Sequence, residues 1–121
     1  MTINAGPIDT AGLQLISASG NMACPACEFE FTHLTDVVVG GRAGEDGDIV
    51  AVQVTSAGEM RSIGESGLPV RPARRHVFSL SGWCEGCGGT FTVSFEQHKG
   101  ETKVTASHVP NDSDMLPDLP V

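Results

Sequence analysis

The chain has 121 residues, and its fifteen Asp and Glu against seven Lys and Arg give a formal net charge of -8 at pH 7. A chain of this length is expected to build a single core, and its acidic balance disfavours nucleic-acid binding through a broad basic surface. No apolar run approaches the roughly 18 residues that cross a membrane, and residues 1–15 lack the basic and apolar regions of an export signal. We therefore expect a cytoplasmic protein without membrane attachment, whose four cysteines stay reduced.

Short stretches of alternating polar and apolar residues favour a fold that is almost entirely β. In the third stretch, Val50, Val52 and Val54 are expected to form the buried face. In the fifth, Phe91 and Val93 are expected to lie together on one face. The strands expected in chain order span residues 12–18, 29–39, 49–55, 76–83, 90–96 and 102–108.

The connections between these stretches differ in character. Lys99-Gly100 suits a tight hairpin turn between the last two strands. Residues 56–74 are rich in Gly, Ser and Pro, and we expect a long irregular loop there that is either mobile or functional. Residues 111–121 carry three carboxylates, two prolines and no basic side chain, which predicts a mobile acidic tail. The expected organisation is one β domain over residues 1–110, followed by this tail.

All four cysteines lie in two C-x-x-C pairs, Cys24-Pro25-Ala26-Cys27 and Cys84-Glu85-Gly86-Cys87. A tight turn over two intervening residues lets both sulfurs of a pair point at one ion, and two such knuckles complete a tetrahedral four-thiolate shell. The sequence therefore predicts a structural Zn²⁺ bound by Cys24, Cys27, Cys84 and Cys87. The expected fold is a zinc-ribbon-like antiparallel sheet whose strands enter and leave each knuckle.

Two other uses of these cysteines remain open. Cys-Pro-x-Cys also occurs in thioredoxin-like redox sites, where the reactive thiol sits at the start of a helix. The residues that follow Cys27 alternate as a strand does, which disfavours that interpretation. The second alternative is a pair of disulfides, or a metal site shared between chains.

The two knuckles and their surroundings resemble a known group of proteins. Thr32-His33-Leu34 follows the first knuckle, and Gln97-His98-Lys99-Gly100 comes after the second, which Trp83 precedes. With these neighbours, the chain is similar over roughly residues 24–104 to small zinc-ribbon-like proteins of actinobacteria and their bacteriophages, a group without an established activity. The resemblance implies the same four metal ligands and a phage or prophage setting, with the host cytoplasm as location if the protein is phage-encoded.

Two further features are candidate contacts. His98 stands beside the expected hairpin turn and is a candidate hydrogen-bond donor to a metal-bound thiolate. Arg71, Arg74 and Arg75 concentrate positive charge and are the candidate contact for an anion such as phosphate.

These features favour a zinc-binding interaction protein with a protein partner. We expect no enzymatic activity, because a closed four-thiolate zinc has no open position for water and the common catalytic motifs are absent from the sequence. One alternative is a structural protein of a virion or its assembly. The other is a nucleic-acid-binding zinc ribbon that uses the segment 71–76 together with three further residues, Lys99, Lys103 and Trp83.

Overall fold

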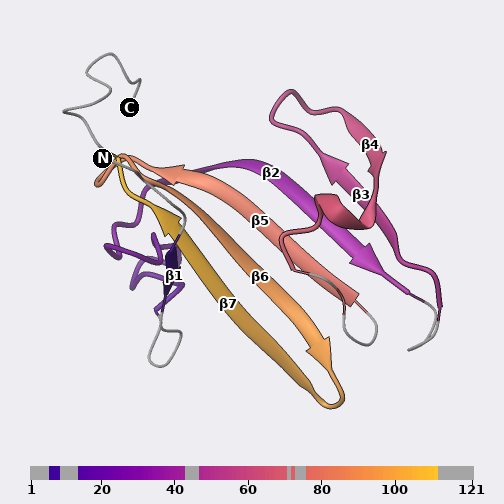
Figure 1. Ribbon diagram of the computed structural model, residues 1–121. Coiled ribbons are helices and arrows are strands. Elements are labelled where there is room, and N and C mark those ends of the chain that lie inside the picture. The colour runs from indigo at the N-terminus through magenta and orange to yellow at the C-terminus, as the bar shows by residue number, and fades with distance from the viewer. Residues whose placement is uncertain (1–5, 9–13, 43–46, 71, 73–75, 112–121) are drawn as a thin grey trace.

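The computed structural model of the chain describes residues 6–8, 14–42, 47–70, 72 and 76–111. They form one antiparallel sheet of seven strands (Figure 1). In chain order the strands are β1 Gly6–Ile8, β2 Thr32–Gly41, β3 Val50–Val54, β4 Met60–Ile63, β5 His76–Cys84, β6 Thr90–His98 and β7 Glu101–Val109. The helical element among the described residues is the 3₁₀ turn η1, Glu65–Gly67. No helix among these residues is long and apolar enough to cross a membrane. The prediction of a mainly β protein built on an antiparallel sheet is confirmed.

The strand order places the two C-x-x-C pairs at the same end of the sheet. The order is β1-β7-β6-β5-β2-β3-β4, so β2 and β5 are antiparallel neighbours near the middle. The start of β2 therefore meets the end of β5, where Thr32 pairs with Cys84. The segment before β2 carries the first cysteine pair, and the connection from β5 to β6 carries the second. Pairing of β2 with β5 thus brings together two motifs that are far apart in the sequence.

Two clusters of buried side chains lie on opposite faces of this sheet. The cluster on one face, which we call the cysteine core, is covered by Leu15 and Met22 from the segment before β2. The cluster on the other face, which we call the leucine core, is covered by the segment that follows β4. The buried members of the cysteine core are Cys24, Cys84, Phe91, Val93 and Ala106. Those of the leucine core are Val38, Ala51, Leu68 and Val77.

The buried face of β3 differs from the prediction. Val50 is 67% exposed and Val54 is 42% exposed, whereas Ala51 between them is only 3% exposed. The reason is that Leu68 packs over the side of the sheet on which Ala51 lies. The three valines point to the opposite face. Over β6 and β7 this same face carries the cysteine core. Hydrophobicity alone therefore predicted the wrong face.

The described part of residues 56–74 contains more regular structure than the sequence predicted. They contain β4, which pairs with β3, and the turn η1. Leu68 and Pro72 from this segment are buried, and the Arg42 side chain donates a hydrogen bond of 2.8 Å from Nη2 to the carbonyl oxygen of Pro72. The segment is thus the cover of the leucine core, and residues 71 and 73–75 lie outside the described residues.

Three other predictions concern the segment before β2, the tail and the last hairpin turn. Residues 14–18 form no strand but a single bridge, Ile16 with Met22, and residues 12–13 lie outside the described residues. The tail prediction falls on residues 111–121, of which only Asn111 is described. The hairpin turn at Lys99-Gly100 is confirmed, since His98 pairs with Glu101 across it.

A bulge in β2 allows this strand to approach β5 closely at one point. The register shifts between Leu34 and Asp36, and here the backbone of β2 passes over Gly82. A Cβ added at Gly82 would lie 2.2 Å from the carbonyl oxygen of His33 and 3.0 Å from the Phe91 ring. The position therefore requires a residue without a side chain.

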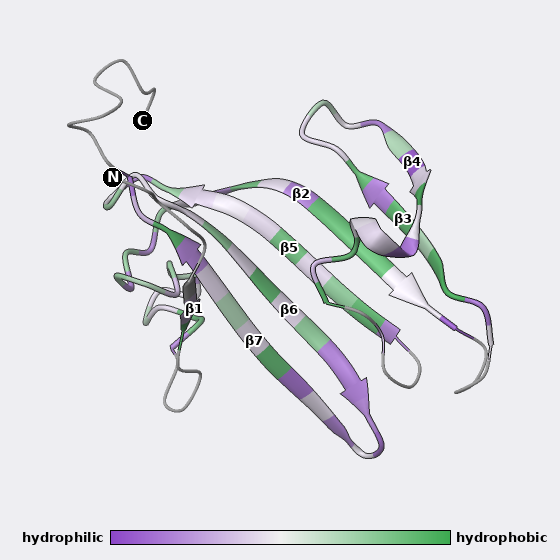
Figure 2. Ribbon diagram, viewed as in Figure 1, coloured by the Kyte–Doolittle hydropathy of each residue, from purple (hydrophilic) through white to green (hydrophobic). Residues whose placement is uncertain are grey.

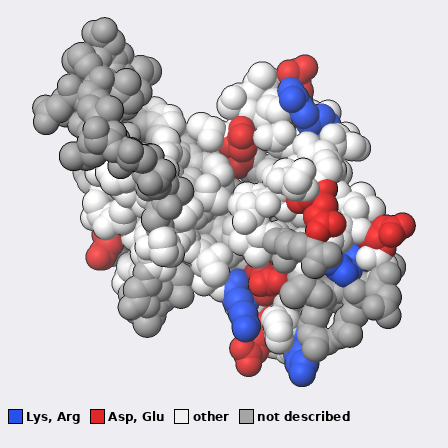
Figure 3. All heavy atoms as spheres, in the orientation of Figure 1, with Lys and Arg blue, Asp and Glu red and all other residues white. Residues whose placement is uncertain are grey.

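Figure 2 shows hydrophobic residues along β2 and β6, and the buried strand residues of the two cores come from β2, β3, β5, β6 and β7. On the face shown in Figure 3, Lys and Arg of the described residues lie close to Asp and Glu and form no basic patch of their own there.

Candidate metal centre

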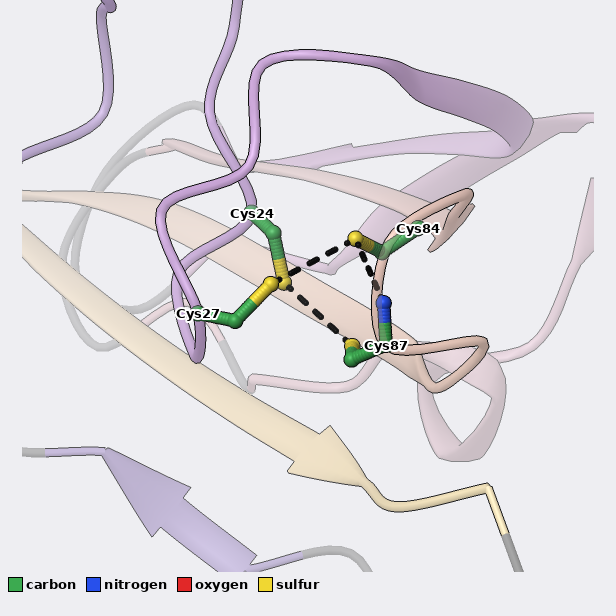
Figure 4. A group of neighbouring side chains, drawn as sticks. All are labelled: Cys24, Cys27, Cys84 and Cys87. Carbon is green, nitrogen blue, oxygen red and sulfur yellow. Dashed lines mark hydrogen bonds between the residues drawn. The ribbon is translucent and has the colours of Figure 1, made fainter. Parts of the chain in front are cut away.

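The four cysteine side chains converge on one point at the end of the sheet (Figure 4). All four sulfurs lie within 4.8 Å of one another. The Sγ atoms of Cys24 and Cys87 are 4.0 Å apart, and those of Cys27 and Cys84 are 3.6 Å apart. A tetrahedral zinc with Zn–S bonds of about 2.3 Å places its sulfurs about 3.8 Å apart. The donor set and its spacing therefore fit a four-thiolate metal ion, and the sulfurs are too far apart for disulfides, whose S–S bond is about 2.05 Å.

The two knuckles have the same backbone conformation. In the first, the N–H of Glu28 donates to the carbonyl oxygen of Cys24 at 2.8 Å, and in the second the N–H of Gly88 donates to that of Cys84 at 2.9 Å. Both residues take a left-handed conformation, with φ of 66° at Glu28 and 71° at Gly88. The second knuckle uses glycine where this conformation is favourable, and the first places a glutamate there at a steric cost.

Backbone N–H groups point at the sulfur that opens each knuckle. The N–H of Ala26 lies 3.4 Å from the Sγ of Cys24. The N–H groups of Gly86 and Cys87 lie 3.3 and 3.5 Å from the Sγ of Cys84. Such N–H groups favour thiolate over thiol, and they fix the direction in which each sulfur points.

The thiols differ in the ease with which they lose their protons. Burial raises the pKa of the Cys24 thiol to about 12. Burial also raises the pKa of Cys87 above its ordinary value. For Cys84, burial acts in the same direction, but the N–H groups of Cys87 and Gly86 and the thiol of Cys27 outweigh it and lower the pKa. Binding of four thiolates therefore requires the loss of protons from thiols whose pKa burial raises, and a positive ion at the centre favours that loss.

The knuckles also contact each other through side chains and backbone. Phe29 lies directly over Gly86, where an added Cβ would be 2.7 Å from the phenyl ring. The N–H of Glu85 donates to the carbonyl oxygen of Phe31 at 3.1 Å. These contacts orient one cysteine pair against the other through the protein alone.

The histidine beside the cluster is His108 and not the predicted His98. His98 ends β6 at the hairpin turn, at the opposite end of that strand from the second knuckle. His108 of β7 instead pairs with Phe91 near the start of β6, and its Nε2 lies 3.6 Å from the Sγ of Cys87. Burial lowers the pKa of His108, which favours a neutral ring that can donate one N–H to the thiolate.

Of the other predicted contacts, those that the structure describes lie at opposite ends of the sheet. Arg71, Arg74 and Arg75 lie outside the described residues. Lys99 and Lys103 are exposed near the β6–β7 turn, whereas Trp83 pairs with Thr90 at the other end of the sheet.

The Trp83 ring is itself occupied by a neighbour. It stacks on the His33 ring at a centroid distance of 4.3 Å and an angle of 9°. His33 in turn lies 2.6 Å from a carboxylate oxygen of Glu85. This ring is therefore covered on one side by the protein, which leaves less of it for a nucleic-acid base.

The fold and the cysteine cluster define a mainly β protein with a possible metal site made of four cysteines. Comparisons with known protein families, with curated proteins and with solved structures gave no match.

Proposed function

We propose that the chain is a small interaction protein in which a Zn²⁺ held by Cys24, Cys27, Cys84 and Cys87 is structural and a surface of the sheet binds another protein. The observation that supports this most is the spacing of the sulfurs across the knuckles, 4.0 Å between Cys24 and Cys87 and 3.6 Å between Cys27 and Cys84. Four thiolates close the zinc tetrahedron and leave no position for substrate or water. We therefore propose a role in holding the fold and none in catalysis.

The binding part of the proposal is supported by apolar side chains that the sheet leaves exposed on its cysteine-core face. Exposed apolar patches of this kind mark sites of protein interaction. A phage or prophage setting and a cytoplasmic location stay predictions.

Native mass spectrometry of protein purified without added metal tests the metal site. We expect one zinc per chain, and a chelator should remove it with loss of the β-sheet signal in circular dichroism, since structural zinc contributes on the order of 10 kcal/mol to small folds. The quadruple Cys→Ser variant is the control for adventitious zinc. Protein without metal, or with the cysteines joined in disulfides, would refute the proposal.

A further inference from the structure

Five apolar side chains form one continuous exposed surface across the strands β2 to β5. Val39 pairs with Phe78 on one side and with Val52 on the other, and Val54 pairs with Met60. Paired residues point to the same face, so these side chains lie together. We call the following set the open apolar patch: Val39 at 47% exposed, Val50 at 67%, Val54 at 42%, Met60 at 77% and Phe78 at 38%.

Only part of this sheet face is covered by the described residues. Over β6 and β7 it carries the cysteine core, under Leu15 and Met22. The opposite face is covered over β2, β3 and β5 by Leu68 and its neighbours. No described segment covers the open apolar patch.

The size of the patch fits one interface with one partner. From the exposed fractions the patch presents on the order of 500 Å² of apolar surface, near the upper end of the roughly 300–600 Å² found for the largest patch of a monomer. A standard interface buries roughly 800 Å² on each partner, of which roughly 55–65% is apolar. The patch therefore supplies the apolar part of one such interface.

The shape of the patch is complementary to itself. Beside Gly41, which has no side chain, lies a cavity of about 700 Å³ that is open to solvent; it is lined by Val39, Val50 and Val52 and also by Arg42, Asp48 and His76. Met60, the most exposed member of the patch, projects at the other end of β3, next to Val54. A twofold axis that lies between two stacked sheets and runs across β3 near Val52 exchanges these two ends. It would place each Met60 over the cavity of the other copy.

The charge of the chain limits where two copies can meet. With a formal charge of -8, two copies repel each other over most of their surfaces. The five members of the patch are uncharged, and Asp48 at the adjoining cavity has Arg42 beside it in the same lining, so stacking at this face brings little like charge together. Sheets stacked face to face lie about 10 Å apart, which lets apolar side chains from both interdigitate.

We infer that the open apolar patch binds a second copy of this chain, in a face-to-face dimer with Met60 of each copy seated in the cavity beside Gly41 of the other. This inference rests on the proposed function, that of an interaction protein whose fold is stabilised by zinc. It identifies the partner of that protein as a second copy of the chain. The resulting contact is isologous and closes at two copies.

Sedimentation equilibrium of the zinc-bound protein tests the dimer. We expect wild type to sediment at twice the mass of the chain. Val50→Asp should weaken the dimer at least ~100-fold, because the twofold axis buries two unpaired carboxylates per interface. Met60→Asp should weaken it similarly. Both side chains are more than half exposed in the single chain, so neither change should disturb its fold.

Thr105→Asp is the matched control, since Thr105 is exposed on the opposite face, where it pairs with Ser94. It should leave the dimer unchanged. A wild-type monomer at roughly 0.5 mM, well above typical dimer dissociation constants, would overturn the inference, even if another protein occupies the patch. So would a dimer that survives Val50→Asp. The zinc content of the same samples tests the proposed function separately. If the proposed zinc site is wrong, the chain contains no zinc, whether it sediments as a monomer or as a dimer.

Discussion

The four cysteines differ in burial, which predicts unequal losses of zinc affinity when each is replaced. Cys24 and Cys84 are fully buried, whereas Cys27 is exposed. When Cys27 is changed to serine, solvent water can reach the metal and complete the tetrahedron. When Cys84 is changed to serine, the site excludes that water. The new hydroxyl also replaces a sulfur that two backbone N–H groups contact at 3.3 and 3.5 Å.

The expected magnitudes follow from the free energy of zinc binding. Structural zinc sites contribute about 10–16 kcal/mol, or about 3 kcal/mol for each of four ligands. Loss of one ligand at Cys27 should therefore weaken zinc binding ~100-fold. At Cys84 a buried and poorly paired hydroxyl adds about 1–3 kcal/mol. The total of about 4–6 kcal/mol corresponds to a loss of ~10³ to 10⁴-fold.

Competition of each variant with a chromophoric chelator measures these affinities, and thermal unfolding followed by circular dichroism measures the accompanying loss of stability. The Cys24→Ser variant should resemble Cys84→Ser, since both sulfurs are buried. Equal affinities for Cys27→Ser and Cys84→Ser, or the reverse order, would refute the argument from burial.

Four further changes are predicted to alter stability or metal binding. Glu28→Gly should raise the free energy of unfolding by about 1 kcal/mol in denaturant titration, because the left-handed conformation at φ 66° disfavours a side chain; an unchanged midpoint would show that no strain exists. Gly82→Ala should cost more than about 3 kcal/mol in the same titration, through the contact of 2.2 Å with the carbonyl oxygen of His33, and a cost below 1 kcal/mol would contradict it. Val93→Ala, at a position with no exposed surface, should cost about 2–3 kcal/mol, and its midpoint should fall without a change in slope. His108→Ala should lower the zinc affinity ~10-fold or more in chelator competition. An unchanged affinity would show that the His108 imidazole does not support the metal site.

Five of the seven strands, β2, β3, β5, β6 and β7, and the clustering of the four cysteines could be predicted from the sequence because they depend on local patterns, whereas β1 and β4 were missed. Alternation over residues 90–96 and 102–108 fixes two strands, and the tight turn at Lys99-Gly100 fixes their register. That register already pairs His108 with Phe91, close to the second knuckle. The signal that identifies His108 in place of His98 was therefore present in the sequence, and the prediction missed it by considering each histidine apart from the hairpin.

The face of β3 that is buried could not be predicted, because it depends on a segment distant in the sequence. Val50, Val52 and Val54 are more apolar than Ala51 and Gln53, so local hydrophobicity favours the wrong face. Leu68 decides the outcome by packing over Gly40, where an added Cβ would lie 2.7 Å from its side chain. Nothing in the Gly- and Ser-rich residues around Leu68 indicates this packing.

The strand β5 supplies residues to both cores, which links the two faces of the sheet. Val77 near the start of β5 belongs to the leucine core, and Cys84 at its end belongs to the cysteine core. We expect removal of the proposed zinc to destabilise the end of β5 that carries Cys84 and, because β5 is paired with β2 and β6, to destabilise Val77 as well. The chain should therefore unfold cooperatively, in one transition whose midpoint is the same for Trp83 fluorescence near the cysteines and for amide exchange near Leu68.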